Sequence, residues 1–151
     1  MSLKLTKKQG GFTLLELLIV IVIIGILALI IVPGLASGPK RARDAQRKSD
    51  LRAIKNALET YFNDNNAYPS ASTSAVTPAT DATISGALVP NYMKTIPDDP
   101  SGGSAHYSYT CTTVASGSCS AFKLDTTLEN TSDHGAGVLS GTNTYEVTSV
   151  N

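Results

Sequence analysis

The apolar run LLELLIVIVIIGILALIIV, residues 14–32, decides the fold of this chain. Its 19 residues are interrupted only by Glu16, Gly25 and the mildly apolar Ala28. As a helix rising about 1.5 Å per residue, the run would be about 28 Å long, close to the hydrocarbon thickness of a bilayer. A core helix of a small soluble domain would carry a polar stripe, and this run has none. We therefore expect a membrane-spanning helix.

Charge is distributed unevenly along the 151 residues, although 12 Lys and Arg balance 12 Asp and Glu. Residues 1–11 carry three positive charges and no negative one, and residues 12–39 carry only Glu16. Residues 40–66 hold seven positive and four negative charges, whereas residues 67–151 hold two positive and seven negative ones. The balanced total excludes a generally basic nucleic-acid-binding protein. The second half is rich in Gly, Ser and Thr, which is typical of an exported protein.

An ordinary secretory signal is the second hypothesis for the N-terminus. The apolar part of such a signal is usually about 7–15 residues long, and small residues follow it at the cleavage site. Gly34-Leu35-Ala36 before Ser37 fits such a site, but 19 apolar residues are long for a signal and an early carboxylate is unfavourable. The count of Lys and Arg around the run would place the C-terminal part in the cytoplasm, whereas two nearby cysteines favour an oxidising compartment. Charge alone leaves the orientation open.

A short motif at the start of the run carries a family resemblance. Basic residues precede Gly10-Gly11-Phe12-Thr13-Leu14-Leu15-Glu16, and the apolar run follows at once. This order resembles the class III signal of type IV pilins and of type II secretion pseudopilins. The resemblance is strong over residues 7–34, weaker to about residue 69, and slight around residues 96–100. It implies a structural filament subunit, not an enzyme, with an α+β fold in which a long N-terminal helix packs against a small antiparallel β-sheet.

The resemblance also implies how the chain matures. A prepilin peptidase would cleave between Gly11 and Phe12 on the cytoplasmic face and N-methylate Phe12, so that the polar part lies outside. Cleavage removes the three leader lysines and creates an α-amino group on Phe12, one helical turn from Glu16. An ionisable group in apolar surroundings is costly without a partner, and the resemblance assigns Glu16 to pairing with the Phe12 amine of a neighbouring subunit. The alternative is a tolerated interfacial carboxylate.

The expected partners and location follow from the same resemblance. The chain would be a single-pass protein of the cytoplasmic membrane before assembly and a homo-oligomer in a helical filament afterwards, either a surface pilus or a periplasmic pseudopilus. An assembly ATPase and a polytopic platform protein would drive polymerisation, because the sequence has no nucleotide-binding motif. The alternatives are a secreted soluble enzyme or binding domain released from an ordinary signal peptide, and a monomeric membrane-anchored binding module.

Glycine and proline residues mark weak points in the long helix. Gly25 lowers helix propensity by about 1 kcal/mol relative to Ala, and Pro33 cannot donate a helical hydrogen bond. We expect residues 25–33 to melt when the subunit leaves the membrane, as in filaments of the family, and a simple kink is the alternative. A hinge before a second helix is also predicted, because further glycine and proline residues follow. These are Gly34, Gly38 and Pro39.

The rest of the chain predicts an amphipathic helix and a small sheet. Over residues 40–64, apolar side chains recur every three or four residues in the second half only, so that half should pack on the sheet. The charged first half should face solvent or neighbouring subunits, with Asp44 pairing with Lys48. Strands are predicted at residues 105–113, 120–128 and 144–150, and a helical turn near residues 85–93. The predicted parts are a leader 1–11, a transmembrane and polymerisation helix 12–34, a hinge and amphipathic helix 35–66, a loop 67–104 and a β-sheet head 105–151.

Two cysteines flank a turn-like segment of seven residues. A disulfide between Cys111 and Cys119 would stabilise the fold by roughly 2.5 kcal/mol in the loop-entropy model, and free thiols are the alternative. Strict strand pairing around such a bridge would put Phe122 on the wrong face of the sheet. We therefore expect a bulge or an offset register there.

Neither catalysis nor nucleic-acid binding is indicated. The sequence has no Gly-x-Ser-x-Gly elbow, no phosphate-binding loop and no His-Glu-x-x-His, and His106 and His134 are expected at the surface. The basic residues between 40 and 48 lack interleaved aromatic residues. We expect them to meet acidic surfaces of adjacent subunits or phospholipid headgroups, and not DNA.

No cofactor is expected. A zinc site is not indicated, because only two cysteines are present and no histidine lies beside them. Calcium is the one open point, since G-type pseudopilins carry a calcium loop, although the carboxylates here do not have the spacing of a compact loop. The candidate ligands are Asp98 with Asp99, or Asp125 with Asp133.

Overall fold

The structure is a computed structural model that describes residues 11–35, 37–70, 74–102, 107–115, 118–139 and 141–149, without the side chains of residues 30–35 and 115. The chain forms two compact units, Met1–Gly38 and Pro39–Asn151, which are described separately. We call the second one the globular unit. Residues 1–10 of the predicted leader lie outside the described residues.

The first unit contains one helix, α1, which runs from Leu14 to Leu35. Its large apolar side chains as far as Leu29 are each at least 47% exposed in the single chain. The helix passes without a break through Gly25 and Pro33, so the predicted melting of residues 25–33 stays a prediction for the filament. In this unit the described side chains end at Leu29. Within the part of the chain whose side chains are described, no helix is both long enough and apolar enough to cross a membrane.

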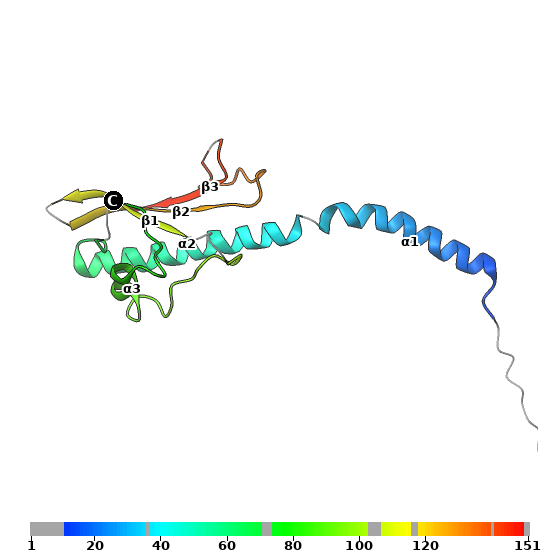
Figure 1. Ribbon diagram of the computed structural model, residues 1–151, viewed down its shortest axis with the longest axis horizontal. Coiled ribbons are helices and arrows are strands. Elements are labelled where there is room, and N and C mark those ends of the chain that lie inside the picture. Colours follow the sequence, from blue (N-terminus) through cyan, green and yellow to red (C-terminus); the bar gives the residue numbers. More distant parts are fainter. Residues whose placement is uncertain are drawn as a thin grey trace, which may run out of the picture. The chain divides into compact units, whose positions relative to one another are not determined.

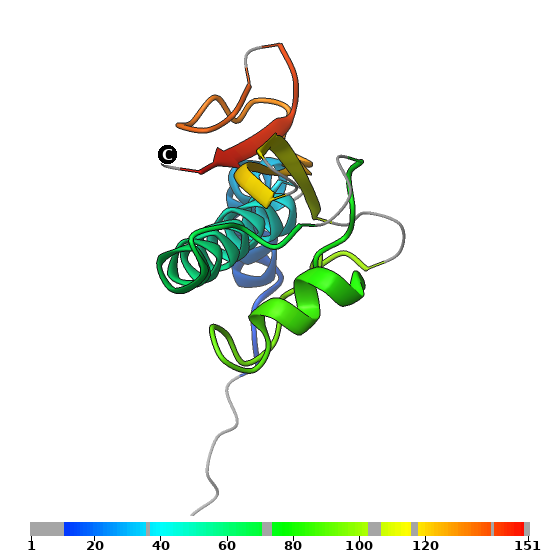
Figure 2. The same ribbon diagram turned by 90° about the vertical axis from the view of Figure 1, so that its left-hand side faces the viewer.

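The globular unit consists of two helices and one sheet (Figure 1). The three strands form an antiparallel sheet in the order β1-β2-β3. Figures 1 and 2 agree that the sheet and α3 lie on different sides of α2. The elements are α2 (Gly38–Asn65), α3 (Ala82–Leu88), β1 (Ser108–Ala115), β2 (Ser118–Thr127) and β3 (Thr144–Thr148).

Both ends of α2 follow signals in the sequence. The helix begins at Gly38 with Pro39 in its first turn, where the missing amide hydrogen of proline costs nothing. It ends at Asn65, because Asn66 adopts a left-handed conformation with φ 54°. The Asn66 amide donates to the Phe62 carbonyl at 2.7 Å, as in a helix C-cap.

The core lies between α2 and the sheet. Three aliphatic residues of the second half of α2 are fully buried, and Tyr61 and Phe62 are partly buried against them, which confirms the predicted packing of that half. Aromatic rings meet them from the sheet side: Tyr68 packs edge-on against Phe122 at 4.7 Å, and Tyr109 stacks on Phe122 at 5.8 Å. The hydroxyls of Tyr68, Tyr107 and Tyr109 each donate a hydrogen bond, because leaving a buried hydroxyl unpaired would cost free energy. The fully buried aliphatic residues of α2 are Leu51, Ile54 and Leu58.

The disulfide and the irregular register are both present in the hairpin of β1 and β2. Cys111 and Cys119 are bonded, which excludes the alternative of free thiols. Cys111 lies opposite Phe122, whereas Cys119 lies opposite Val114, and the register shifts on both sides of Thr113. This shift confirms the predicted bulge, and it lets both cysteines and Phe122 be buried.

Most of the first half of α2 is exposed, as predicted, but one side of it is buried. Asp44 and Arg47 are each only 2% exposed, and Asp44 pairs with Arg47 instead of Lys48. The prediction missed this buried side because it counted only apolar residues as buried. Charged residues can also form a buried helix face when each charge has a partner.

Candidate functional site

The first candidate site is the start of α1. Leu14 is the first helical residue, so Thr13 occupies the N-cap and Glu16 the third helical position. The Glu16 carboxylate accepts hydrogen bonds from the Thr13 amide at 2.8 Å and from the Thr13 hydroxyl at 2.9 Å. The Thr13 hydroxyl oxygen in turn accepts from the Glu16 amide at 3.2 Å. These reciprocal contacts form a capping box.

The capping box adds a residue to the predicted site. Thr13 was missed by the sequence prediction, although the Thr-x-x-Glu spacing is itself a capping-box signal. Both bonds from Thr13 end on Oε2 of Glu16, so Oε1 can accept from an ammonium group. Phe12 lies beside the N-cap and is 88% exposed. The box therefore fixes the Glu16 carboxylate close to the residue whose amine cleavage would free.

The predicted hinge residues lie at the junction of the two helices. Gly34 lies in the last turn of α1, which ends at Leu35, and Gly38 and Pro39 open α2. The helices therefore end and begin within the predicted interval, and motion of the chain at this point stays a prediction.

The second candidate site is an ion-pair network inside the globular unit, centred on Arg47. The Arg47 guanidinium donates to both carboxylate oxygens of Asp99, from Nε at 2.6 Å and from Nη2 at 2.9 Å. Nη1 donates to Asp44 at 2.7 Å, and Nη2 lies 2.9 Å from Glu129. Three carboxylates from distant parts of the sequence thus meet one buried cation.

Asp44 extends this network to the backbone of the loop after β2. Its carboxylate accepts the amide hydrogens of Glu129 at 2.9 Å and of Asn130 at 2.8 Å. Arg43 donates to both oxygens of Glu129, at 2.7 and 2.5 Å. The first turns of α2 therefore fix both the segment around Asp99 and the loop between β2 and β3.

The network keeps Asp99 and Glu129 ionised. Burial would raise the pKa of Asp99, but hydrogen bonds from Arg47 and Ser101 outweigh it and lower this pKa to about 2. The hydrogen bond from Arg43 likewise lowers the pKa of Glu129 to about 2. The pKa of Arg47 is raised, chiefly by its hydrogen bond to Asp99. Because these groups stay charged around neutral pH, the network can hold loops in place but is not suited to proton transfer.

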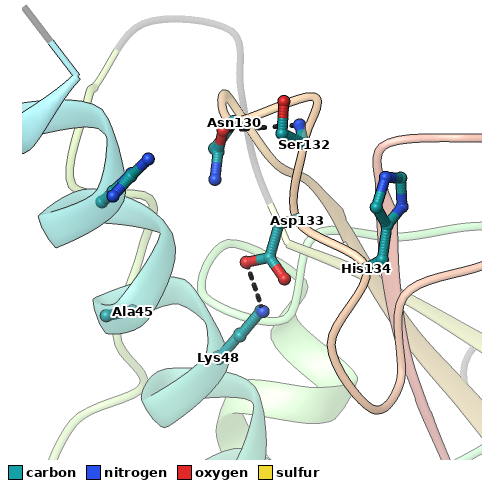
Figure 3. A pocket seen from close by; sticks show the side chains of 7 residues that line it. Ala45, Lys48, Asn130, Ser132, Asp133 and His134 are labelled. Atoms are coloured by element: carbon teal, nitrogen blue, oxygen red, sulfur yellow. Dashed lines mark hydrogen bonds and ion pairs between the residues drawn. The ribbon is translucent and has the colours of Figure 1, made fainter.

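An open pocket of about 410 Å³ lies beside this network, between α2 and the loop that follows β2 (Figure 3). Lys48 reaches across it and donates to Asp133 at 2.6 Å. This hydrogen bond is the main reason why the pKa of Asp133 is lowered. His134 is exposed at the pocket, as predicted, whereas His106 lies outside the described residues. The lining residues are Arg41, Ala45, Lys48, Asn130, Ser132, Asp133 and His134.

The carboxylates considered for calcium do not fit a metal site. Within the described ranges, no group of three His, Cys, Asp or Glu side chains is placed to hold a metal ion. Three of the four candidate carboxylates are engaged by cations of the chain itself, and Asp98 accepts the amide hydrogen of Asp99 at 2.8 Å. The ion pairs are Asp99 with Arg47, Asp133 with Lys48, and Asp125 with Lys123.

Known proteins resemble this chain along most of its length. It is 37% identical over 108 residues to type II secretion system core protein G of Vibrio cholerae, covering 70% of this chain and 74% of that protein. The protein of the same name from Escherichia coli is 39% identical over 105 residues, covering 66% and 72%. No solved structure matches the chain.

Two family models match consecutive parts of the sequence. Residues 6–32 match the prokaryotic N-terminal methylation motif, which includes the predicted cleavage site and Glu16. Residues 35–135, more than half of the chain, match type II secretion system protein G. The chain therefore carries the methylation motif of prepilins and belongs to the type II secretion system protein G family, a family of structural pseudopilins and not of enzymes.

Proposed function

We propose that this chain is a structural subunit of the pseudopilus of a type II secretion system. The observation that carries the proposal is the surface of α1, which is apolar on all sides and holds one charge, Glu16. Its large apolar side chains up to Leu29 are exposed in the single chain. A continuous apolar surface of this size marks an interaction site. Packing of many α1 helices against one another would remove this surface from water.

Maturation precedes assembly in this proposal. The apolar run of residues 14–32 lies in the cytoplasmic membrane, with the globular unit outside, where the disulfide of Cys111 and Cys119 is stable. A prepilin peptidase removes residues 1–11 and N-methylates Phe12. An assembly ATPase and a platform protein then drive polymerisation.

Glu16 sets the register between subunits. In the apolar interior of the filament, its carboxylate requires a cation, and the amine of Phe12 on the neighbouring subunit supplies one. The hydrogen bonds from Thr13 hold the carboxylate at the helix start, so the pair forms only at one axial offset. An unpaired ionisable group in such surroundings costs about 3 kcal/mol, which corresponds to more than a hundredfold in an equilibrium constant.

The test replaces Glu16 in the full chain and measures filaments sheared from cells that carry the secretion machinery. Glu16→Leu should lower the filament fraction about a hundredfold, because the Phe12 amine loses its counter-ion. The amount of processed subunit in the membrane should stay the same. Thr13→Val is the matched control, since it removes only the hydroxyl of the capping box, and its loss should be several-fold at most.

Mass spectrometry of the mature N-terminus completes this test. Methylated Phe12 is the expected first residue, whereas Ser37 would show release from an ordinary signal peptide. Normal filaments with unchanged subunit spacing from Glu16→Leu would disprove the register mechanism.

A further inference from the structure

The pocket between α2 and the loop after β2 holds more positive than negative charge. Arg41 and Lys48 line it from α2, and Asp133 is the one carboxylate among the described lining residues. Lys48 donates to Oδ2 of Asp133 at 2.6 Å, and the Gly135 amide donates to Oδ1 at 3.0 Å. Both oxygens of this carboxylate are therefore engaged by the chain itself, and the charge of Arg41 remains.

Arg41 is the lining cation without a counter-ion. It is exposed, and it has no hydrogen-bond or ion-pair partner within the ranges that the structure describes. The carboxylates of the adjoining network are already engaged. Arg43 holds both oxygens of Glu129, and Asp44 accepts from Arg47 and from two loop amides. A guanidinium at the edge of this pocket is thus available to an anion from outside the chain.

A small residue lies between the two cations of α2. Arg41, Ala45 and Lys48 follow one another at spacings of four and three residues, so they lie on the same face of the helix. The two cations are about 10 Å apart along the helix axis. Because Ala45 carries only a methyl group, it leaves space between two long, flexible side chains. An anion bound above Ala45 is therefore within reach of both.

Hydrogen-bond donors line the opposite side of the pocket. Asn130, Ser132 and His134 reach it from the loop after β2 (Figure 3). The side-chain oxygen of Asn130 accepts from the Ser132 amide at 3.4 Å, which leaves the side-chain nitrogen available to donate. The Ser132 hydroxyl and a ring nitrogen of His134 are also donors. Donors on both sides of one pocket favour a ligand with several acceptor oxygens.

We propose that this pocket binds a phosphate group that the headgroup of an anionic phospholipid presents. Phosphate carries negative charge and acceptor oxygens on several sides, and a guanidinium binds two of them at once. A metal cation does not suit the pocket, because its carboxylate is already paired with Lys48. The volume of about 410 Å³ and the opening to solvent leave room for the glycerol that a headgroup phosphate carries.

The place of the pocket in the chain favours a membrane source of phosphate. Arg41 follows Val32, the last residue of the apolar run, by nine residues. These nine residues span about 14 Å as a helix and about 32 Å at most when fully extended. The headgroup assignment rests on the proposed function, because it takes the apolar run to lie in the membrane before assembly. A bound headgroup would hold the globular unit at the membrane surface until the subunit joins a filament.

The test titrates the full chain in an uncharged detergent and follows its amide resonances by NMR. The probes are inorganic phosphate and glycerophosphorylglycerol, the deacylated headgroup of phosphatidylglycerol, with sodium chloride at equal ionic strength as the reference. Both probes should shift the amide resonances of Ala45, Ser132 and His134 in a saturable way. The same resonances should differ between nanodiscs of phosphatidylglycerol and nanodiscs of phosphatidylcholine.

Three variants separate a built site from general attraction to a basic helix. Arg41→Gln should weaken headgroup binding about tenfold, because it removes a charged, bidentate contact. Ala45→Gln should weaken binding about as much, since its longer side chain fills the pocket while every charge stays. Arg52→Gln is the matched control, because it removes an exposed arginine of the same helix that does not line the pocket. Its binding should stay within about twofold of the wild type.

Other outcomes would overturn the proposal. Equal losses for Arg41→Gln and Arg52→Gln, unchanged binding by Ala45→Gln, or no saturable shift with either probe would each exclude a phosphate site in this pocket. Shifts with inorganic phosphate alone, or equal spectra in the two kinds of nanodisc, would exclude the headgroup as the source. The titrations require neither cleavage at Gly11 nor assembly. A chain that binds the headgroup but forms no filaments would therefore refute the proposed function and not this site.

Discussion

The two long helices, α1 and α2, obtain their partners in opposite ways. α1 is almost entirely apolar, and its described large apolar side chains stay exposed in the single chain. α2 is rich in charge, yet it buries Asp44 and Arg47 as completely as its leucines. From side-chain chemistry alone, the apolar α1 would be expected in the interior of the chain and the charged α2 at its surface. On the proposed function, the contrast teaches that α1 is satisfied by other molecules, whereas the buried side of α2 is satisfied by its own chain.

This division separates assembly from stability. Substitutions in α1 should change filament formation and leave the unfolding of the globular unit unaltered. Substitutions in the Arg47 network should do the opposite, because its partners all lie in the globular unit. The following variants all change the globular unit, so each should alter its unfolding and leave filament formation largely unchanged. A variant that lost filaments without losing stability would disprove the division between the two helices.

Arg47→Met should have the largest effect on stability. It removes the cation from three carboxylates, of which Asp44 and Asp99 stay buried without a counter-ion. Removing one partner of a buried ion pair costs about 3–5 kcal/mol, and denaturant unfolding of the purified protein measures this loss. Arg52→Met is the control and should change the free energy of unfolding by less than about 0.5 kcal/mol. Equal unfolding free energies for the two variants would show that the network is not important for stability.

Replacing both cysteines by alanine should have the next largest effect. The bond between Cys111 and Cys119 closes a short loop in the β1–β2 hairpin, and its loss should cost roughly 2.5 kcal/mol. Thermal unfolding of the wild type with and without reductant provides the same comparison without a mutation. A variant with wild-type stability would mean that the hairpin is held by its strand pairing and by the Tyr68 contacts to Cys119 and Phe122.

Acid should destabilise the globular unit by a smaller amount. The pKa values of Asp99 and Glu129 are lowered to about 2 in the folded chain, below the value of about 4 expected when unfolded. Their contribution is therefore complete above about pH 4 and is lost as the pH falls from there towards 2. The melting temperature should be constant from about pH 7 to 5 and then fall by about 5–10 °C. Arg47→Met should show a weaker decline, and an equal one would assign the effect to other carboxylates.

Local patterns predicted those parts of the fold that depend on nearby residues. The ends of α2, its apolar second half, the three strands and the disulfide all follow from periodicity, capping and spacing. Asp44 shows where such patterns fail: its spacing to Lys48 suggests a pair one turn apart, but both residues have partners about 85 positions away. Long-range pairing of charges leaves no periodic signal, so the Arg47 network could not be predicted. Thr13, by contrast, could have been found from its distance to Glu16.

The smallest predicted effect on stability concerns Lys48. Its ammonium group pairs with the Asp133 carboxylate, which a cation from solution could otherwise bind. Lys48→Met leaves the half-buried Asp133 with only the Gly135 amide, and the loss in the free energy of unfolding should be about 1 kcal/mol.

Calcium at about 5 mM should not raise the melting temperature of the wild type, because the chain supplies its own cations to Asp99, Asp125 and Asp133. A ligand present far above its Kd would raise the melting temperature by several degrees. A shift with calcium, absent with the same concentration of magnesium, would show that an outside cation completes this loop and that α2 is not satisfied by its own chain alone.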